Sequence, residues 1–552
     1  MKALTPVRSA SLGVVILLAG AVSFADSTPR REDRGDLIVL HLAGSYEEMG
    51  RQQAELLGPV MREVYAFDRA DYAASVAKLP FSGRALEPIA LPLASGLADD
   101  ASGFAATVRG IAAVLGVAPR EVLRASFALD AGSTVFVATR AATADGGALI
   151  GRNVDWGDAG GRRRPVVAHL RPDNGDLAHI SVGWPLMHLP TVGLNEAGFA
   201  ISLNYFDTEP LVTLMRPEWP QRRALQTARS VDDGIRIFLE TERLGAANYV
   251  AMADATGAIA LLECRPGTTC SVFRPSGDWF AHANHARSAA MLGFDRYRSP
   301  DSFGRQREME HAVERHLGSL TPARAAEILR DRTGHRFPNA TSVGNLFVLN
   351  AVVVQPATGL LWHATTRQPD APFGEYVPFS PTGDPHGAAS LPASPVLATD
   401  TFAAELDAIA RARRAVDAQR SGRAAEAREI WDVLAAEDPP RLDPARIALA
   451  RAHALHTLGE DAAAFAALAP AEDSAAPYDA RAYGLAQRAW LADRLGRRDE
   501  AVRLWEALRT HLEAAPEFNA FEKLRALASA GRAAPAAHGE LPMSWWDIGV
   551  AR

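Results

Sequence analysis

Three side chains of the kind used in hydrolysis stand at the two ends of one predicted β-hairpin. Ser133 heads an apolar run, and Arg152 and Asp155 close the next run, GGALIGRNVDW. A glycine-containing turn separates the two runs, which is typical of paired antiparallel strands. The pairing brings a hydroxyl, a guanidinium and a carboxylate together and predicts acyl transfer by a serine nucleophile.

Ser133 needs a base before its hydroxyl can attack a carbonyl carbon. One solution in enzymes is to cleave the chain before the serine, so that its own α-amine accepts the proton. An α-amine has an unperturbed pKa of roughly 7.7–8.0, which is close to working pH. Arg152 and Asp155 on the neighbouring strand would fix and polarise that amine, and later strands would supply donors for the oxyanion.

The elements that must position these side chains are short strands mixed with amphipathic helices. A capping box of Ser45 and Glu48 predicts the start of the first helix. The expected order is strand 36–41, further helices to about 130, β-rich runs over 133–271 with a helix near 221–242, helix 303–331, and strands over 346–365. This order predicts an α+β fold with mostly antiparallel sheets rather than a regular βαβ alternation.

Five motifs follow one another in the order and spacing of the N-terminal-nucleophile (Ntn) hydrolases. They are GSYEEMGRQQAELL, VRGIAAVLGV, GGALIGRNVDW, VGLNEAGFAISLNYF and FAHANHARS. The chain most resembles the penicillin acyltransferase (isopenicillin-N acyltransferase-like) family and is more distantly similar to choloylglycine hydrolase. The resemblance covers roughly residues 36–375.

The resemblance implies a four-layer αββα sandwich and a precursor that cleaves itself once, between Gly132 and Ser133. It implies that Arg152 and Asp155 lie beside the amine of the nucleophile. Members of these families usually have Cys-Thr where this chain has Ser133-Thr134. Serine and threonine serve as nucleophiles in other Ntn hydrolases, so the chemistry remains available to this chain.

Further site residues follow from the same resemblance. Asn204 matches an asparagine that orients substrate or binds the oxyanion, Asn284 matches a second asparagine near the nucleophile, and Arg305 is a looser match to a late catalytic arginine. Trp156 and Tyr205 are expected to line the acyl pocket. The implied activity is hydrolysis or acyl transfer at linear amide bonds of N-acylated small molecules, without a cofactor.

The composition along the chain predicts several segments. They are a signal peptide (1–25), a helical N-terminal segment that serves as propeptide or small chain (26–132), the Ntn-hydrolase core (133–375), a Pro/Gly-rich linker (376–400) and a helical, repeat-like domain (401–552). The signal predicts a periplasmic or secreted protein. A membrane anchor is the alternative, but the apolar run is shorter than the roughly 20 residues of a membrane span.

The last segment contains glycines at equal spacing, each followed by small and large apolar residues at fixed offsets. The recurring positions are Gly422, Gly459 and Gly496, then Ala427, Ala464 and Ala501, then Trp431, Leu468 and Trp505. This pattern indicates tetratricopeptide-like helical pairs, which would serve for a protein partner or self-association. An Ala-rich helical bundle without true repeats is the alternative.

Cys264 and Cys270 are the only cysteines and flank a predicted turn, which makes them a disulfide candidate in an oxidising compartment. No metal site is expected, because the closest histidine pairs, in HANHAR and HAVERH, lack the Glu of a His-Glu-x-x-His motif. Ser75 and Lys78 fit a Ser-x-x-Lys pattern, but the chain has no Lys-Thr-Gly to accompany it.

The charge balance argues against binding to nucleic acid. The net charge is −7, with acids and bases mixed along the whole chain. The resemblance to the Ntn hydrolases implies a small-molecule N-acyl substrate as the ligand, and no membrane span is expected after signal cleavage. The alternative from a different class is a catalytically inactive Ntn-fold scaffold that binds a protein through its helical repeats.

Overall fold

A computed structural model of the chain describes residues 28–78, 103–125, 132–155, 161–186, 190–205, 218–241, 248–265, 270–295, 301–332, 342–385, 387–514, 521–535 and 541–543. The predicted signal peptide and Trp156 lie outside the described residues. Within these ranges, none of the helices has both the length and the apolar character that a membrane span requires.

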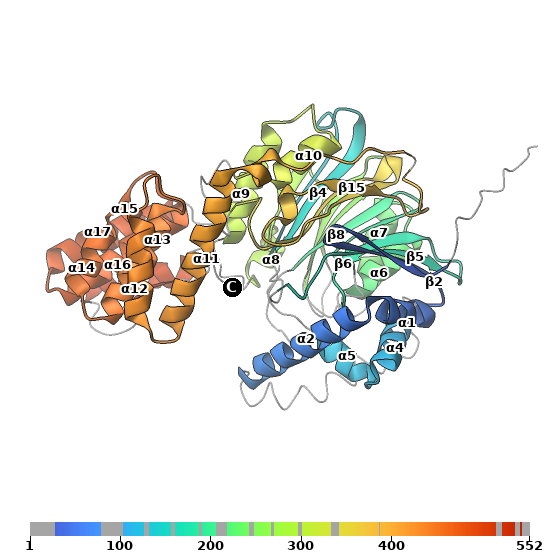
Figure 1. Cartoon of the computed structure of the whole chain (residues 1–552). Coiled ribbons are helices and arrows are strands. Elements are labelled where there is room, and N and C mark those ends of the chain that lie inside the picture. Colours follow the sequence, from blue (N-terminus) through green and yellow to red (C-terminus); the bar gives the residue numbers. More distant parts are fainter. Residues whose placement is uncertain are drawn as a thin grey trace, which may run out of the picture.

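Two β-sheets lie between the helices of the N-terminal and central parts of the chain (Figure 1). In sheet A the strand order is β1 (Arg30–Arg34), β2 (Leu37–Gly44), β5 (Val166–Pro172), β6 (His179–Gly183), β7 (Val192–Asn195), β8 (Phe199–Tyr205), β9 (Asn248–Asp254), β10 (Ile259–Cys264) and β11 (Ser271–Phe273). In sheet B it is β12 (Trp279–His282), β3 (Gly132–Arg140), β4 (Gly146–Asp155), β13 (Val348–Gln355), β14 (Leu360–Ala364) and β15 (Tyr376–Phe379). Neighbouring strands are antiparallel except for the parallel pair β2–β5.

The sheets pack face to face and share one apolar core. Val135, Val137 and Ile150 of sheet B meet Leu194 and Leu261 of sheet A there, all shielded from solvent. Both faces of each sheet are covered, so the central strands are buried along their whole length, as in β9 and β10. This explains why their sequences are continuous apolar runs rather than alternating ones.

Helices cover the outer face of each sheet and complete the four layers. Over sheet A lie α1 (Tyr46–Leu57), α2 (Pro59–Lys78), α4 (Phe104–Leu115), α5 (Pro119–Ala125), α6 (Glu218–Thr227) and α7 (Val231–Glu240); over sheet B lie α9 (Asp301–Glu314) and α10 (Pro322–Leu329), with the short α8 (Ala289–Leu292) before them. The capping box of Ser45 and Glu48 begins α1 as expected. The predicted αββα sandwich is confirmed.

The β3–β4 hairpin has a register that decides which side chains share a face. Ser133 pairs with Val154, and Val135 pairs with Arg152. Side chains alternate along a strand, so Ser133 and Arg152 face sheet A, whereas Thr134 and Asp155 face the α9 side. Arg152 and Asp155, which the sequence places three residues apart, therefore lie on opposite faces of sheet B.

The C-terminal region is helical and lies beside the sandwich (Figure 1). It contains α11 (Asp400–Arg420), α12 (Ala424–Ala435), α13 (Pro444–Thr457), α14 (Asp461–Ala467), α15 (Ala469–Glu472), α16 (Tyr478–Arg494), α17 (Arg498–Glu513) and α18 (Glu522–Ala533). Sheet B extends past the core boundary expected at 375, because β15 begins at Tyr376. The Arg332–Glu405 ion pair (2.7 Å) and the Phe373–Phe402 ring contact join the helical region to the sandwich.

The regularly spaced residues of this region occupy equivalent places. Gly422, Gly459 and Gly496 all have positive φ (76°, 81° and 71°) in the turns between helices. The alanines and the large apolar residues that follow each glycine are fully buried. The tetratricopeptide-like relationship of these helices stays a prediction.

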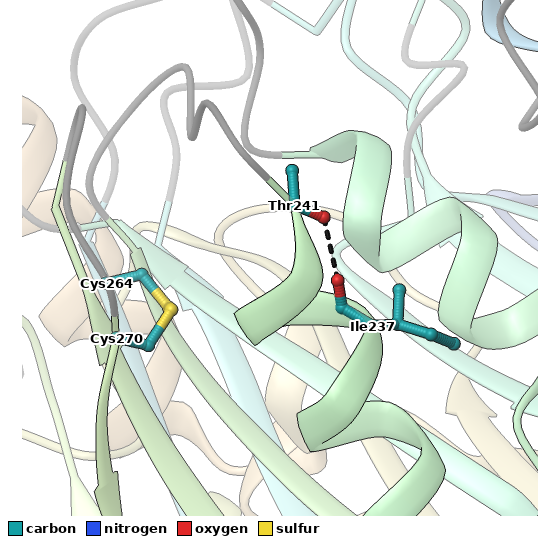
Figure 2. The surroundings of a disulfide bond; sticks show 4 residues. All are labelled: Ile237, Thr241, Cys264 and Cys270. Carbon is teal, nitrogen blue, oxygen red and sulfur yellow. Dashed lines mark hydrogen bonds between the residues drawn. A yellow bond between two sulfur atoms is a disulfide. The ribbon is translucent and has the colours of Figure 1, made fainter.

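A disulfide joins Cys264 and Cys270, with 4.1 Å between their Cα atoms. It ties the end of β10 to the start of β11, beside the end of α7, where the Thr241 hydroxyl donates to the Ile237 carbonyl (Figure 2).

Buried neutral histidines make the fold sensitive to acid. His363 lies between the sheets with no exposed surface, where its Nε2 contacts Asn350 Oδ1 (2.9 Å) and burial lowers its pKa to about 4. In the unfolded chain His363 has its ordinary pKa of about 6.5, so between about pH 6.5 and pH 4 the unfolded chain binds a proton that the folded protein does not. The free energy of unfolding therefore falls as the pH is lowered through this range.

We expect His363→Gln to remove part of this acid sensitivity. Between pH 7 and pH 5, the wild-type free energy of unfolding should fall by about 2 kcal/mol more than that of the variant, from linkage with these two pKa values. Urea denaturation of both proteins at the two pH values measures the difference. Equal losses of stability in the two proteins would contradict the assignment of a neutral buried His363.

Candidate active site

The hydroxyl of Ser133 lies in the core between the sheets, where the residue is 1% exposed. Arg152 Nη2 on β4 donates to Ser133 Oγ (2.9 Å), and Arg152 Nη1 donates to Ser202 Oγ on β8 (2.7 Å). Burial lowers the pKa of Arg152 to about 9, against the opposing effect of Asp155. A desolvated cation thus acts directly on the hydroxyl oxygen that is expected to attack.

The other face of the same strand is held by Arg305 on α9. Its Nη1 donates to the carbonyl oxygen of Ser133 and to Thr134 Oγ1, both at 2.7 Å. Arg305 also pairs with two buried carboxylates, Asp301 (2.8 Å) and Asp155 (3.2 Å). Helix α9 therefore fixes the backbone of the nucleophile through one fully buried guanidinium.

Asn284 holds the backbone nitrogen of Ser133. Its Oδ1 accepts from Ser133 N (2.7 Å) and from Arg305 Nη2 (2.9 Å), while its Nδ2 donates to the Tyr205 carbonyl (2.8 Å). The nitrogen, the carbonyl oxygen and the hydroxyl of Ser133 thus each bond to a different buried side chain. The sequence-predicted residues Arg152, Asn284 and Arg305 are the three that make these bonds.

Asn204 lies close by on β8 but is engaged elsewhere. Its Nδ2 donates to the carbonyls of His282 (3.2 Å) and Ala283 (2.9 Å), directly before Asn284. Both amide hydrogens are therefore committed to the backbone in the uncleaved chain. The oxyanion role of Asn204 stays a prediction, and it requires one of these two bonds to open.

Gly132 is enclosed by the site. A Cβ atom at this position would lie 3.2 Å from both Arg305 Nη2 and Asp155 Cβ, which is tighter than ordinary packing. Glycine before the nucleophile thus lets α9 and β4 approach the peptide bond that is expected to break. Tyr205, expected to line the acyl pocket, is half-buried at the end of β8 and supplies its carbonyl to Asn284.

Three site residues were not anticipated from the sequence. Ser202 shares a guanidinium with Ser133, Asp301 pairs with Arg305, and Asn345 Nδ2 donates to Asp155 Oδ1 (2.9 Å). Ser202 is recognisable by strand alternation, since it stands two residues before Asn204. Asp301 and Asn345 carry no such signal, because they reach the site from a helix start and a loop.

Other chemistry considered for the chain finds no geometric support in the described residues. They contain no cluster of three or more His, Cys, Asp or Glu side chains that would hold a metal ion. His282 and His285 instead belong to the buried surroundings of Asn284. The side chains of Ser75 and Lys78 lie outside the described residues.

Comparison with known proteins finds a family match for the central part of the chain. Residues 142–364 match the family model described as acyl-coenzyme A:6-aminopenicillanic acid acyl-transferase. This region is therefore similar to that acyl-transferase family. The resemblance predicted from the motifs is thus confirmed, and the match spans β4 to β14 with Arg152, Asp155, Asn204, Asn284 and Arg305.

Solved structures with similarity to this chain are more distant. A Caenorhabditis elegans N-acylethanolamine-hydrolyzing acid amidase ortholog shares 13% identity over 41% of this chain and 93% of its own, with a TM-score of 0.30. A mutant of the conjugated bile acid hydrolase from Clostridium perfringens shares 10% identity over 47% of this chain and 95% of its own, with a TM-score of 0.29. No curated protein matches the sequence.

Arg305 is expected to dominate the stability of the site. Replacing it with Met, in a Ser133→Ala background that keeps the chain uncleaved, leaves the carboxylates of Asp155 and Asp301 buried without their cation. The free energy of unfolding should fall by about 3–5 kcal/mol, the usual cost of breaking a buried ion pair.

Arg324 provides the matched control, since it pairs with Glu327 on the surface of α10 with both side chains about half exposed. Arg324→Met should change the free energy of unfolding by less than about 1 kcal/mol. Urea denaturation measures the free energy of unfolding of both variants. Similar losses in the two would refute the proposed contribution of the Arg305 contacts to stability.

Proposed function

We propose that the protein is a secreted or periplasmic amidohydrolase or acyltransferase that cleaves itself between Gly132 and Ser133 and then acts on N-acylated small molecules. The observation that carries the proposal is the set of three bonds around Ser133, one to each polar atom. The Cys264–Cys270 disulfide supports a location in an oxidising compartment.

Self-cleavage starts with attack of Ser133 Oγ on the carbonyl carbon of Gly132. The hydroxyl proton passes to Ser133 N as the peptide C–N bond breaks, which leaves an ester between Gly132 and the serine oxygen. Water then hydrolyses this ester, giving a carboxylate on Gly132 and a free α-amine on Ser133. Arg152 stabilises negative charge on Oγ, and Arg305 and Asn284 prevent the backbone from turning away.

Turnover of a substrate reuses the same groups. The α-amine of Ser133 takes the hydroxyl proton as Oγ attacks the acyl carbonyl, and it returns a proton to the departing amine. Water or another amine then releases the acyl group from Oγ. The scheme needs no cofactor and no metal, and linear amides are its proposed substrates.

Replacement of the nucleophile tests the self-cleavage. We expect the mature wild-type chain to give a fragment that begins at Ser133, and Ser133→Ala to remain intact because no hydroxyl is present to attack. Ser133→Cys should still cleave, since a thiol is the more nucleophilic group. Intact-mass spectrometry and N-terminal sequencing measure the products; a wild-type chain that stays whole would favour the inactive scaffold instead.

The role of Asn204 is tested on the cleaved enzyme. Loss of one oxyanion donor lowers kcat by about 100- to 1000-fold. Asn204→Ala should therefore lose activity to this extent, with little change in KM, on the best substrate found in a screen of N-acyl amides of varied chain length. Unchanged kcat in a normally cleaved Asn204→Ala protein would show that this asparagine serves only to hold the 282–283 backbone.

A further inference from the structure

The segment 282–288 carries Asn284, and a row of side chains on sheet A holds it. The row consists of Asn204 on β8, Tyr249 on β9 and Glu263 on β10, which are direct neighbours across the sheet. All three are at most 1% exposed and face sheet B. Sheet A thus presents a continuous polar row to the segment that positions the nucleophile.

Each member of the row contacts a different part of the segment. Asn204 bonds to the first two carbonyls, and the Tyr249 ring packs against the His282 ring with 4.2 Å between centroids. Glu263 accepts from the backbone nitrogens of Arg287 and Ser288, both at 2.7 Å. The two ends of the segment are therefore fixed on either side of Asn284.

The contact made by Glu263 is the strongest of these, because a carboxylate accepts two short bonds from backbone amides. His282 Nε2 lies 3.7 Å from the same carboxylate. Burial alone would raise the pKa of Glu263, but the interactions with His282, Ser288 and Arg287 outweigh it and leave the pKa below its usual value. The carboxylate is therefore charged in the folded protein at neutral pH.

We propose that Glu263 is a positioning residue for the nucleophile: it holds the backbone of residues 287–288 so that Asn284 Oδ1 stays bonded to Ser133 N. The proposal rests on the self-cleavage proposed above. Glu263 itself touches neither Ser133 nor the peptide bond that breaks, so its effect on chemistry passes through Asn284. Cys264 follows Glu263 directly, and its disulfide ties this end of β10 to β11.

The test compares Glu263→Gln with Asp254→Asn in the mature full-length chain. Asp254 is a matched control because it is also 1% exposed and accepts from backbone nitrogens, including Val231 (2.8 Å) and Thr256 (2.9 Å). It stands at the opposite end of β9 from Tyr249. Both substitutions replace a buried carboxyl group that accepts from backbone nitrogens by an amide, so both should lower the melting temperature.

Only Glu263→Gln should slow self-cleavage, by about tenfold or more, because an amide nitrogen then faces a backbone donor and the 287–288 backbone shifts. The rate is followed by intact mass after synthesis of the chain. A wild-type rate in Glu263→Gln, or an equal slowing in Asp254→Asn, would overturn the positioning role.

A second measurement separates this proposal from the proposed function. In the Ser133→Ala background, hydrogen–deuterium exchange reports the amides of residues 133, 287 and 288 without any cleavage. Glu263→Gln should speed their exchange at least tenfold, and Asp254→Asn should leave it unchanged. If the wild-type chain does not cleave itself, the proposed function fails, but the exchange measurement still tests the positioning role of Glu263. Unchanged exchange in Glu263→Gln overturns that positioning role.

Discussion

Two buried guanidinium groups on opposite faces of one strand are the constraint on which the site depends. Arg305 is neutralised by Asp301 and Asp155 and holds backbone, so it acts as a structural clamp. Arg152 instead bonds to two hydroxyls, those of Ser133 and Ser202. Its pKa is lowered because burial disfavours the charged guanidinium. Arg152, whose hydrogen bonds go to hydroxyls rather than to carboxylates, is thus the cation at the attacking oxygen, where it can stabilise negative charge.

The sandwich is the means by which such an arrangement stays fixed. Ser133 and Arg152 come from sheet B, Ser202 from sheet A, and Arg305 from the helical layer beyond, so three layers meet at one strand. The two sheets share one apolar core, and a second apolar core joins sheet B to α9 and α10. A shift of α9 would move the Ser133 carbonyl, and a shift of sheet A would move the Oγ partner and the segment with Asn284. The packing of the layers therefore determines the geometry of the groups around Ser133.

Strand pattern and ordered motifs predict the sandwich, the hairpin and the residues that bond to Ser133. Strand alternation also implies that residues 152 and 155 face opposite ways, and that Ser202 shares a face with Asn204. Asp301, Asn345 and Glu263 could not be predicted, because their roles arise from tertiary contacts between segments far apart in the chain. Nor could the sequence indicate that the amide hydrogens of Asn204 are taken by the backbone.

Cleavage would change the electrostatics of the nucleophile. The Ser133 nitrogen is now an amide that donates to Asn284; after cleavage it would be an amine with a pKa to be set by its neighbours. Arg305 and Arg152 disfavour a further positive charge there, whereas Asp155 and Asp301 favour it. Burial adds to the effect of the cations, because Ser133 is only 1% exposed, and desolvation of the amine would lower its pKa below the ordinary value of roughly 7.7–8.0. The amine would then be neutral near pH 7 and able to accept the proton of Oγ, so the groups that position the uncleaved bond also prepare the base.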